Sequence, residues 1–575
     1  MRKLTVVLLV ATSMCACIDG PSGSGNPNSP TDMSADQGAD MTVTPPEDMG
    51  IDMPPVDMSD VDMPDVLEDM PVDMADVDPF DMQDMNEGPR FNCDATNRPN
   101  PLGEGTEDSP YIICFPENLV FMNNSDAHFV LGKDIEVTDN WEPIPSFRGY
   151  FDGQGFKIEG LFLDNNNVGK AMGTCMGRLS PRFDGRFQGN YVGAFISALS
   201  ASATIENVDF AEIKVGATDE RISYPFTLKV GEAGTEENIR CYPLMGGLFG
   251  LIGGDGETPA TLRNIRIQGL EAHVGGSFGG LAFEARSPNI DNVHVLKGAA
   301  VPSINVTNTH TSGFITYAEQ PRISSSSVHL NIAISGETIT SPNIAASTFA
   351  DTALFVGYVT GGTFERVVAN GSIQTLAIHG APIQGSLGGL IGVARSAEQH
   401  GPVEISDCLV NVSIDADNNA VGGVIGRADV FFHPQTIRDC GVGVVGRTPA
   451  SLVARKFAGA IFGQVDDNGM STPDQGIVLE NVFSLADLGE DSVGCVFGQG
   501  DFNSATFGRT YTKISPESDE TFMFAGEVLN CSARVFLETL EADELNTIGW
   551  LRRADDTYVP AAIAPMLDEI GFFGP

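Results

Sequence analysis

LGGLIG at Leu387–Gly392 and VGGVIG at Val421–Gly426 are two copies of one short phrase, and this phrase decides the fold. Variants of it occur along most of the chain: YVGAF, MGGLFG, VGGSFGG, FAGAIFG and VGCVFG begin at Tyr191, Met245, Val274, Phe457 and Val493. We take one glycine per copy as the register, and successive register glycines lie 29 to 54 residues apart. A period in this range is typical of a stacked repeat array. The register is Gly193, Gly247, Gly276, Gly313, Gly357, Gly389, Gly423, Gly459 and Gly494.

A second phrase follows the first after a variable loop, with apolar residues at both of its ends, as in IENV from Ile205, LRNI from Leu262 and ISDC from Ile405. Apolar and polar residues alternate after it, and period two indicates a β-strand. Because one coil cannot bury its apolar face alone, the coils must stack on one another. The pattern predicts an all-β parallel β-helix. Asparagine and aspartate tolerate left-handed backbone, so we expect turn-formers at one bend of each coil: Asn207, Asn264, Asn292, Asp407, Asp439 and Asn481.

The N-terminus has the features of an export signal. Arg2 and Lys3 precede an apolar run that is too short to span a membrane, and small residues lead to Cys15 and Cys17. The arrangement resembles a bacterial lipoprotein signal over residues 1–17, and Cys17 after Ala16 fits the lipidated position better than Cys15. Plain secretion and a leader that is not cleaved are the alternatives.

Residues 18–90 form an acidic segment. It carries 19 Asp and Glu residues between Ile18 and Pro89, no Lys or Arg, and ten Asp-Met pairs. Such a segment cannot bury enough apolar surface to offset its ordering entropy, so we predict a disordered tether. The net charge of the whole chain is −45, which makes nucleic acid a poor partner. We expect membrane contact through the lipid anchor only, and a monomer.

Eight cysteines remain after the leader, and an even number in an exported protein favours disulfides. We expect Cys93 to pair with Cys114, Cys175 with Cys241, and Cys495 with Cys531. Cys408 and Cys440 occupy the same inward position one coil apart, and they form either a disulfide or a pair of stacked core thiols.

The flanks of the repeats differ from the repeats themselves, and exposed strand edges at each end of a β-helix need covering. We expect an N-terminal cap and first coil over residues 91–165, with a short helix at 116–123. The β-helix repeats should cover 166–510 and a C-terminal cap 511–575. Within that cap we expect a helix over 539–548, with Trp550 and Tyr558 packed beneath it.

FDGQGFKIEGL at Phe151–Leu161, followed by phrases such as GGLFG and GGLIG, resembles the GLUG-motif proteins of bacterial surfaces, and the likeness extends over residues 109–560. The resemblance implies a right-handed parallel β-helix on an adhesin-like protein. It also implies a location at the cell surface. Ile18 follows Cys17 in place of an acidic residue, which by resemblance to the sorting of enteric lipoproteins favours the outer membrane as the site of anchoring. The family includes regions that precede IgA-cleaving metallopeptidases, but the chain has no HExxH motif and hence no such zinc site.

One row of polar residues is the sharpest candidate for a binding site. Asp209, Arg266, His294 and His329 are assigned to the first outward position after the second phrase in successive coils, where they would lie about 5 Å apart. Such a row suits a polysaccharide, whereas a solvated strand face is the simpler explanation. The same column continues as Val368, Leu409, Gly441 and Phe483, which is either a partner site or a strip that a loop covers.

No catalytic motif accompanies these residues in the sequence, so we expect no catalytic residue, no cofactor and no dedicated metal site. The loops at 415–419 and 466–468 are acidic enough to bind calcium opportunistically. The function that we predict is a non-enzymatic adhesion or binding module with a glycan or a surface protein as ligand. A polysaccharide lyase or hydrolase is the alternative, and a passive spacer is the third possibility.

Overall fold

The computed structural model describes Cys93 and most of residues 100–570. Residues 79–575 form one compact unit, and residues 1–78 form a second unit that lies wholly outside the described residues, as do Cys17 and nearly all of the expected tether. The segments of five or more residues after 100 that lie outside the described part are 173–177, 180–187, 231–236, 297–302, 336–350, 377–384, 444–450, 467–475, 489–495, 513–522, 529–541 and 571–575.

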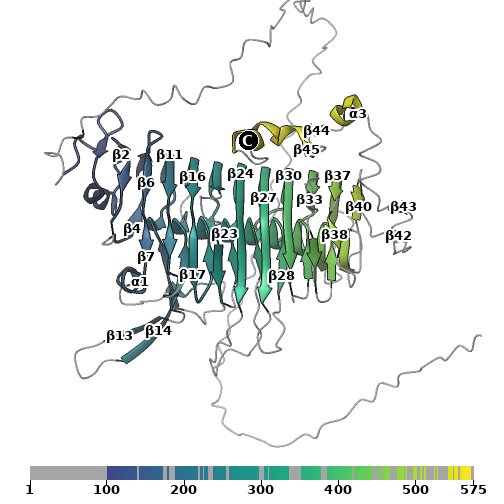
Figure 1. Cartoon of the computed structure of the whole chain (residues 1–575), viewed down its shortest axis with the longest axis horizontal. Coiled ribbons are helices and arrows are strands. Elements are labelled where there is room, and N and C mark those ends of the chain that lie inside the picture. Colours follow the sequence, from purple (N-terminus) through teal and green to yellow (C-terminus); the bar gives the residue numbers. More distant parts are fainter. Residues whose placement is uncertain are drawn as a thin grey trace, which may run out of the picture. The chain divides into compact units, whose positions relative to one another are not determined.

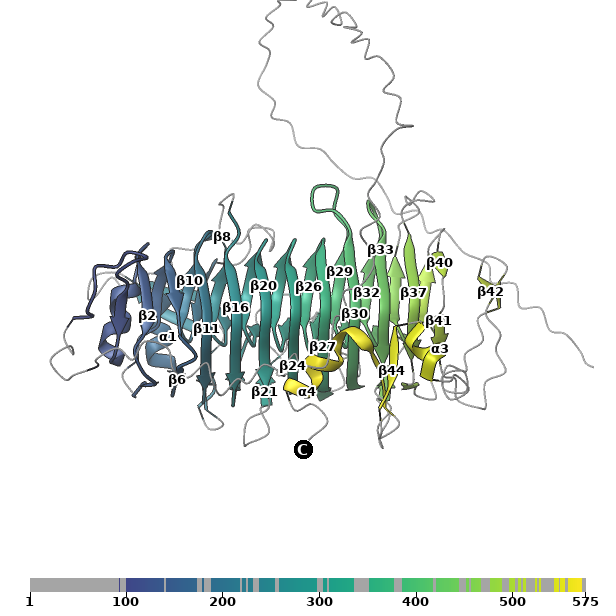
Figure 2. The same ribbon diagram turned by 90° about the horizontal axis from the view of Figure 1, so that it is seen from above.

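Three long sheets of almost entirely parallel strands make up the body, and each coil between residues 188 and 488 contributes to all three in turn (Figure 1). Sheet C comes first in a coil, sheet B follows it after a short corner, and sheet A takes the second phrase and the alternating residues after it. In the second view the strands lie side by side along the whole body (Figure 2). The predicted parallel β-helix is confirmed.

The strands of sheet A are β1 (Tyr111–Ile113), β2 (His128–Leu131), β3 (Ile135–Glu136), β5 (Tyr150–Asp152), β6 (Lys157–Glu159), β7 (Phe162–Leu163), β11 (Thr204–Ala211), β12 (Lys214–Val215), β16 (Thr261–Gln268), β17 (Glu271–Val274), β20 (Asn289–Leu296), β21 (Ser303–Val306), β24 (Arg322–Ser335), β27 (Gly362–Leu376), β30 (Val403–Asp415), β33 (Gln435–Val442), β34 (Ser451–Val453), β37 (Ile477–Ser484), β38 (Asp487–Leu488), β40 (Ala505–Phe507) and β41 (Thr510–Thr512).

The strands of sheet B are β4 (Ile144–Phe147), β10 (Ile196–Leu199), β15 (Phe249–Ile252), β19 (Ala282–Arg286), β23 (Ile315–Glu319), β26 (Val356–Thr360), β29 (Ile391–Arg395), β32 (Ile425–Asp429), β36 (Phe462–Asp466) and β39 (Phe497–Asp501). Those of sheet C are β8 (Arg178–Leu179), β9 (Gln188–Gly193), β14 (Glu237–Gly246), β18 (Phe278–Gly279), β22 (Thr311–Ser312), β25 (Thr352–Ala353), β28 (Ser386–Gly388), β31 (Ala420–Gly422) and β35 (Phe457–Gly459), with β13 (Phe226–Val230) antiparallel to β14.

The strand pairing corrects the glycine register. The predicted glycines at 247, 313, 389 and 423 stand one residue past the position that pairs with Gly193, while Gly276 and Gly357 belong to other positions of the coil. The phrase holds several glycines, so its letters alone do not fix which of them align. The column that the pairing aligns is Gly193, Gly246, Gly279, Ser312, Ala353, Gly388, Gly422 and Gly459.

A bend in sheet A repeats at one register, and its residues have left-handed backbone. The φ angles lie between 48° and 54° at Asn207, Asn264, Asn292, Ser325, Arg366, Asp407, Asp439 and Asn481. The predicted turn-formers are therefore confirmed, but they bond to one another as well as turning the chain. Asn264 Nδ2 donates to Asn207 Oδ1 at 2.8 Å, and Asn292 Nδ2 donates to Asn264 Oδ1 at 2.9 Å. An amide ladder thus runs along the bend and links successive coils.

The core lies inside the stacked coils, and its residues repeat at fixed registers. The first apolar residue of the second phrase is buried in every coil, and these side chains form one column: Ile205, Leu262, Ile290, Ile323, Phe364, Ile405, Ile437 and Leu479. Aromatic rings stack in the same way, with Phe314 and Phe355 at 4.6 Å between ring centroids. Each coil therefore completes the apolar interior of its neighbours.

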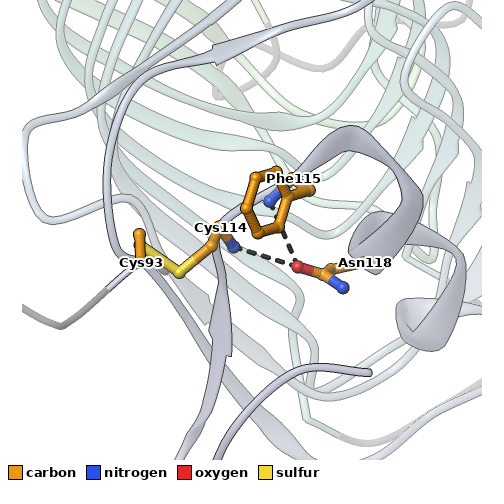
Figure 3. The surroundings of a disulfide bond; sticks show 4 residues. All are labelled: Cys93, Cys114, Phe115 and Asn118. Carbon is orange, nitrogen blue, oxygen red and sulfur yellow. Dashed lines mark hydrogen bonds between the residues drawn. A yellow bond between two sulfur atoms is a disulfide. The ribbon is translucent and has the colours of Figure 1, made fainter. Parts of the chain in front are cut away.

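The first coil begins with a short element that is closed by a disulfide. The helix expected at 116–123 is a 3₁₀ helix, η3 (Pro116–Met122). Cys93 and Cys114 are bonded, with their Cα atoms 5.4 Å apart, and the Asn118 side chain accepts hydrogen bonds from the backbone N–H groups of Cys114 and Phe115 (Figure 3). The carboxamide of Asn118 replaces a backbone partner where the chain turns from strand into helix. Farther on, the helix α1 (Asn165–Met172) follows β7.

Cys408 and Cys440, for which the sequence left two states open, form a disulfide inside the core. Their residues pair across β30 and β33, their Cα atoms are 4.4 Å apart, and both are fully buried. The other expected pairs involve Cys175, Cys495 and Cys531, which lie outside the described residues, and Cys241, which is described only as part of β14.

The C-terminal segment runs along the outer face of sheet A, which differs from the predicted end cap. It contains α3 (Ala542–Thr547), the antiparallel pair β44 (Trp550–Arg552) and β45 (Tyr558–Pro560), η5 (Ala561–Ile563) and α4 (Ala564–Glu569), whereas the short pair β42 (Met523–Phe524) and β43 (Glu527–Val528) precedes it. We call residues 550–569 the strap. Figure 2 shows it lying across β27 and β30.

Apolar contacts fix the strap to the sheet. Val559, Ile563 and Leu567 of the strap pack on Val368 and Leu409, and all five side chains are buried. The Trp550 ring lies against Gly441, where an added Cβ would come within 2.7 Å of the ring. Helix α3 lies within the range expected for a helix, 539–548, and Trp550 and Tyr558 are buried as expected, but the strap that contains these two residues covers a side of the solenoid, where an apolar column needs cover.

Asn264→Ala should lower the stability of the body more than Asn264→Gly. Alanine loses two ladder hydrogen bonds and must also hold a left-handed backbone, whereas glycine loses the hydrogen bonds alone. We expect a cost of about 2–4 kcal/mol for alanine, of which about 1–2 kcal/mol comes from the backbone. Urea unfolding followed by circular dichroism measures both. Equal midpoints for the two variants would refute a left-handed bend.

Leu567→Asp should release the strap, because the carboxylate would have to enter a buried apolar contact with Val368 and Leu409. Release would expose the apolar strip, and we expect stronger binding of a hydrophobic dye and faster proteolysis near residue 550 at an unchanged β-sheet spectrum. The matched control is Asp568→Asn at an exposed neighbouring position, which should leave the apolar contact in place. Wild-type dye binding by Leu567→Asp would show that the strap does not shield this face.

Candidate binding surface

Three of the four predicted binding residues share one column on the outer face of sheet A. Asp209 pairs with Arg266, and Arg266 pairs with His294 in the next coil. The next residue of the column is Ser327, and Val368, Leu409, Gly441 and Phe483 follow it as predicted. Neighbouring members are about one strand spacing apart, about 4.8 Å.

The placement of His329 in this column was wrong. His329 lies two residues farther along β24 and pairs with Asn370. The coil that contains it has Ser325 at the bend, in place of the Asn or Asp that marks the bend in the other coils from Asn207 to Asn481, except the next one, which has Arg366. Without an Asn or Asp at this bend, the sequence did not show which residue of the coil aligns with His294.

His294 is fully buried and both of its ring nitrogens have partners. Nδ1 lies 2.8 Å from Ser327 Oγ, and Nε2 lies 2.6 Å from Asn292 Oδ1 in the amide ladder. Because the Asn292 oxygen can only accept, Nε2 carries the proton and Nδ1 accepts from the serine hydroxyl. Burial, reinforced by the positive charge of Arg266, lowers the pKa of His294 to about 4. The ring is a neutral structural element that links the bend to the next coil.

Arg266 and Asp209 lie nearer the surface. The Arg266 guanidinium donates to Glu569 Oε1 of the strap at 2.6 Å, so this side chain fastens the end of the strap. Burial raises the pKa of the half-buried Asp209 carboxyl, although the Arg266 charge opposes the shift. The strap therefore occupies the column that looked like a ligand site: Arg266 holds its end, and Val368 and Leu409 hold its apolar side chains. The sequence left two explanations open for the apolar strip, a partner site or a covering segment of the chain. The covering segment is the correct one.

A groove lies elsewhere, along the corner where sheet B passes into sheet A. It has a volume of about 620 Å³ and crosses several coils. Its floor contains Asn289, Arg322 and Thr363, which pair in successive strands and form an outward column at the start of sheet A. Ala201 and residues 258–260 line one end, and His400, Pro402 and Glu404 line the other. Six successive coils contribute to the groove, so it extends about 24 Å along the solenoid at about 4.8 Å per coil.

Tight corners keep the floor of the groove open. Ser287 and Gln320 have left-handed backbone, with φ of 46° and 44°, and Gly361 and Gly362 supply the same turn in the next coil. A Cβ on Gly361 would lie 2.0 Å from the His400 carbonyl oxygen, so only glycine fits there. Backbone hydrogen bonds join these corners, from Ser287 N to Glu319 O at 2.6 Å and from Gln320 N to Thr360 O at 2.9 Å. The groove is thus a preformed surface with a fixed backbone.

The groove was not predicted, although the sequence carries a signal for it. Prolines stand just before the sheet A strands in several coils, where they hold the corner extended before the strand begins. They are Pro259, Pro288, Pro321, Pro402 and Pro434. The sequence alone does not show the strand bounds: one or two residues separate the strands of sheets B and A in the corners between residues 286 and 362, whereas residues 396–402 form a longer connection.

The acidic loops give little support for a metal site. Within the described ranges, no group of three or more His, Cys, Asp and Glu side chains is placed to hold a metal ion. Asp466 is paired with Arg427 at 3.2 Å, and residues 417–419, 467 and 468 lie outside the description. No helix among the described residues is both long enough and apolar enough to cross a bilayer.

The stability of the body should fall as the pH is lowered through the range in which His294 would be protonated if unfolded. The folded pKa is about 4 and the ordinary value is 6.5, so the unfolded chain binds more protons between these pH values. Stability from this group is complete above about pH 6.5 and decreases toward pH 4, by at most about 3 kcal/mol. We expect His294→Gln to flatten the loss in melting temperature between pH 7 and 4.5. Parallel curves for both proteins would contradict a buried neutral ring.

Comparisons with known proteins are sparse. No protein-family model and no curated protein matches the chain. Among solved structures, an IgA1 protease matches at 14% identity with a TM-score of 0.33, over 72% of this chain and 22% of that protein. A candidate immunoglobulin A1 protease from Bacteroides ovatus matches at 14% identity with a TM-score of 0.28, over 69% of this chain and 86% of that one. The chain therefore spans about a fifth of the first protein, and similarity at this level does not extend to function.

Proposed function

We propose that the protein is an extracytoplasmic lipoprotein whose β-helix binds an extended glycan along the corner groove without chemical turnover. The groove is the observation that supports this proposal most strongly. It is long, preformed and lined by polar groups that recur at every coil. Other parts of the outer face are less open, because the strap covers the column of Val368 and Leu409.

The spacing of the floor residues suits a polymer. Asn289, Arg322 and Thr363 offer a carboxamide, a guanidinium and a hydroxyl at intervals of one coil. The coil spacing, about 4.8 Å, is close to the length of one sugar residue in an extended glycan. A chain of sugars laid along the solenoid axis would therefore meet a new hydrogen-bonding side chain with each residue. Because the backbone beneath is fixed by the corner hydrogen bonds, little ordering would be needed on binding.

Display at the cell surface fits the same role. In the proposal, Cys17 carries the lipid and the acidic segment at 18–90 holds the β-helix away from an outer membrane. Its 19 acidic residues repel one another and extend the segment. A binding module on such a tether could reach a glycan beyond the membrane surface.

A carbohydrate-active enzyme is the second candidate, and one observation favours it. His400 and Glu404 both line the same end of the groove, and they are the residue types that transfer protons in glycan cleavage. His400 Nε2 is 3.0 Å from Glu319 Oε1, so the imidazole already has an acidic partner. We place binding ahead of turnover because the polar floor extends over many coils, whereas this pair occupies one end.

A glycan array probed with the mature full-length chain, combined with an assay for released oligosaccharides, tests the proposal. We expect binding and no release. Release of product that is lost in Glu404→Gln would establish the enzyme instead. The absence of both binding and release would leave a passive spacer and would refute the proposal.

The location of binding can be tested with a double variant of the groove floor. Asn289→Leu together with Thr363→Leu removes two hydrogen-bonding groups, and at about 0.7 kcal/mol each we expect roughly ten-fold weaker binding of the best array glycan by calorimetry. Thr436→Leu is the matched control, because Thr436 continues the same column beyond the groove. If the double variant and the control bind equally well, the glycan is held elsewhere.

A further inference from the structure

We infer that the groove selects acidic glycans and that the guanidinium of Arg322, in the middle of its floor, binds the acidic group of the sugar. This inference rests on the proposed function and adds the chemical class of the ligand. Arg322 follows Asn289 and precedes Thr363 in the floor column, so its head lies between the two ends of the groove. A guanidinium matches the two oxygens of a carboxylate or a sulfate with paired hydrogen bonds.

Arg322 differs from the other arginines on this face of sheet A. Each of those has a glutamate partner: Arg263 with Glu206 at 3.4 Å, Arg438 with Glu480 at 3.4 Å, Arg266 with Glu569 at 2.6 Å, and Arg366 with Glu365. Arg322 is exposed and makes no ion pair or side-chain hydrogen bond with any residue that the structure describes. Its two neighbours in the column are uncharged, so the charge is available to a ligand.

The surroundings of Arg322 in the groove carry both signs of charge. Arg286 lines the groove from sheet B, and its Nε donates to Glu284 at 2.8 Å, so this charge is partly used within the protein. Glu404 stands two coils from Arg322, about 10 Å along the solenoid. An acidic group would therefore be favoured near Arg322 and disfavoured at the Glu404 end. This predicts one acidic sugar in a defined position, and not attraction along the whole groove.

The net charge of the chain strengthens the assignment. At −45, the protein repels polyanions in general, and a polyanion without the right geometry gains little from one unpaired cation. An acidic polypeptide has its carboxylates on flexible side chains and would also have to order its backbone. A glycan places its acidic group on a stiff ring at a repeat close to the coil spacing. We therefore take the glycan as the ligand and the polypeptide as a competing outcome of the test.

The inference can be tested with matched pairs of polymers that differ only in charge. Polygalacturonate is compared with its methyl ester, dextran sulfate with dextran, and polyglutamate serves as the polypeptide. Binding of each to the full chain is measured at low and at 0.5 M salt. We expect the charged member of at least one glycan pair to bind at least ten-fold more tightly, and Arg322→Ala to weaken that binding roughly ten-fold or more while leaving the neutral member unchanged.

The controls separate this inference from the proposed function. Arg438→Ala removes an arginine that is paired and lies outside the groove, and it should leave binding unchanged. Arg322→Lys keeps the charge but loses the paired geometry, and it should restore only part of the affinity. Equal binding of charged and neutral glycans overturns the inference while the proposed function stands. Binding of polyglutamate as tightly as the acidic glycan also overturns it, and binding of no glycan at all defeats both proposals.

Discussion

In-register stacking of the coils is the constraint on which the rest of the structure depends. Each coil has to bring its apolar residues to the same inward position as its neighbours, and the column from Ile205 to Leu479 shows that it does so over most of the body. The left-handed bend enforces this register. Asn207, Asn264 and Asn292 can adopt the bend at small cost and bond to one another, so a coil that slipped by one residue would lose both its core contacts and its place in the ladder.

The architecture could be predicted because the same sequence pattern recurs in each coil. The glycine phrase, the second phrase and the bend residues recur often enough that an error in one copy does not alter the conclusion. A position in a single coil has no such support. His329 was misplaced where Ser325 had replaced the bend marker, and Gly276 and Gly357 were taken for register glycines because the phrase holds several candidates. The place of residues 559–567 was not predicted for another reason: Val368 and Leu409 show in the sequence that something apolar must cover them, but not that these residues do so.

The difference between features that recur in many coils and features that belong to one coil also explains where the candidate site lies. The row of Asp209, Arg266 and His294 was attractive as a sequence pattern, yet His294 is buried in the bend and Arg266 holds the strap. The corner groove depends instead on differences between coils, namely short corners at Ser287 and Gln320 beside the longer loop at residues 396–402. Among the residues that the structure describes, Arg322 in the floor of that groove has no glutamate partner, unlike Arg263 and Arg438. Regular coils build the scaffold, and the departures from regularity build the site.

The most direct test of this account is a crystal structure of the β-helix with a short oligogalacturonate. We expect sugar rings along the solenoid axis at the corner between sheets B and A, with a carboxylate held by Arg322 and the glycan chain intact. Sugar bound elsewhere on the body, or a ligand in the groove that leaves Arg322 without a contact, would contradict it.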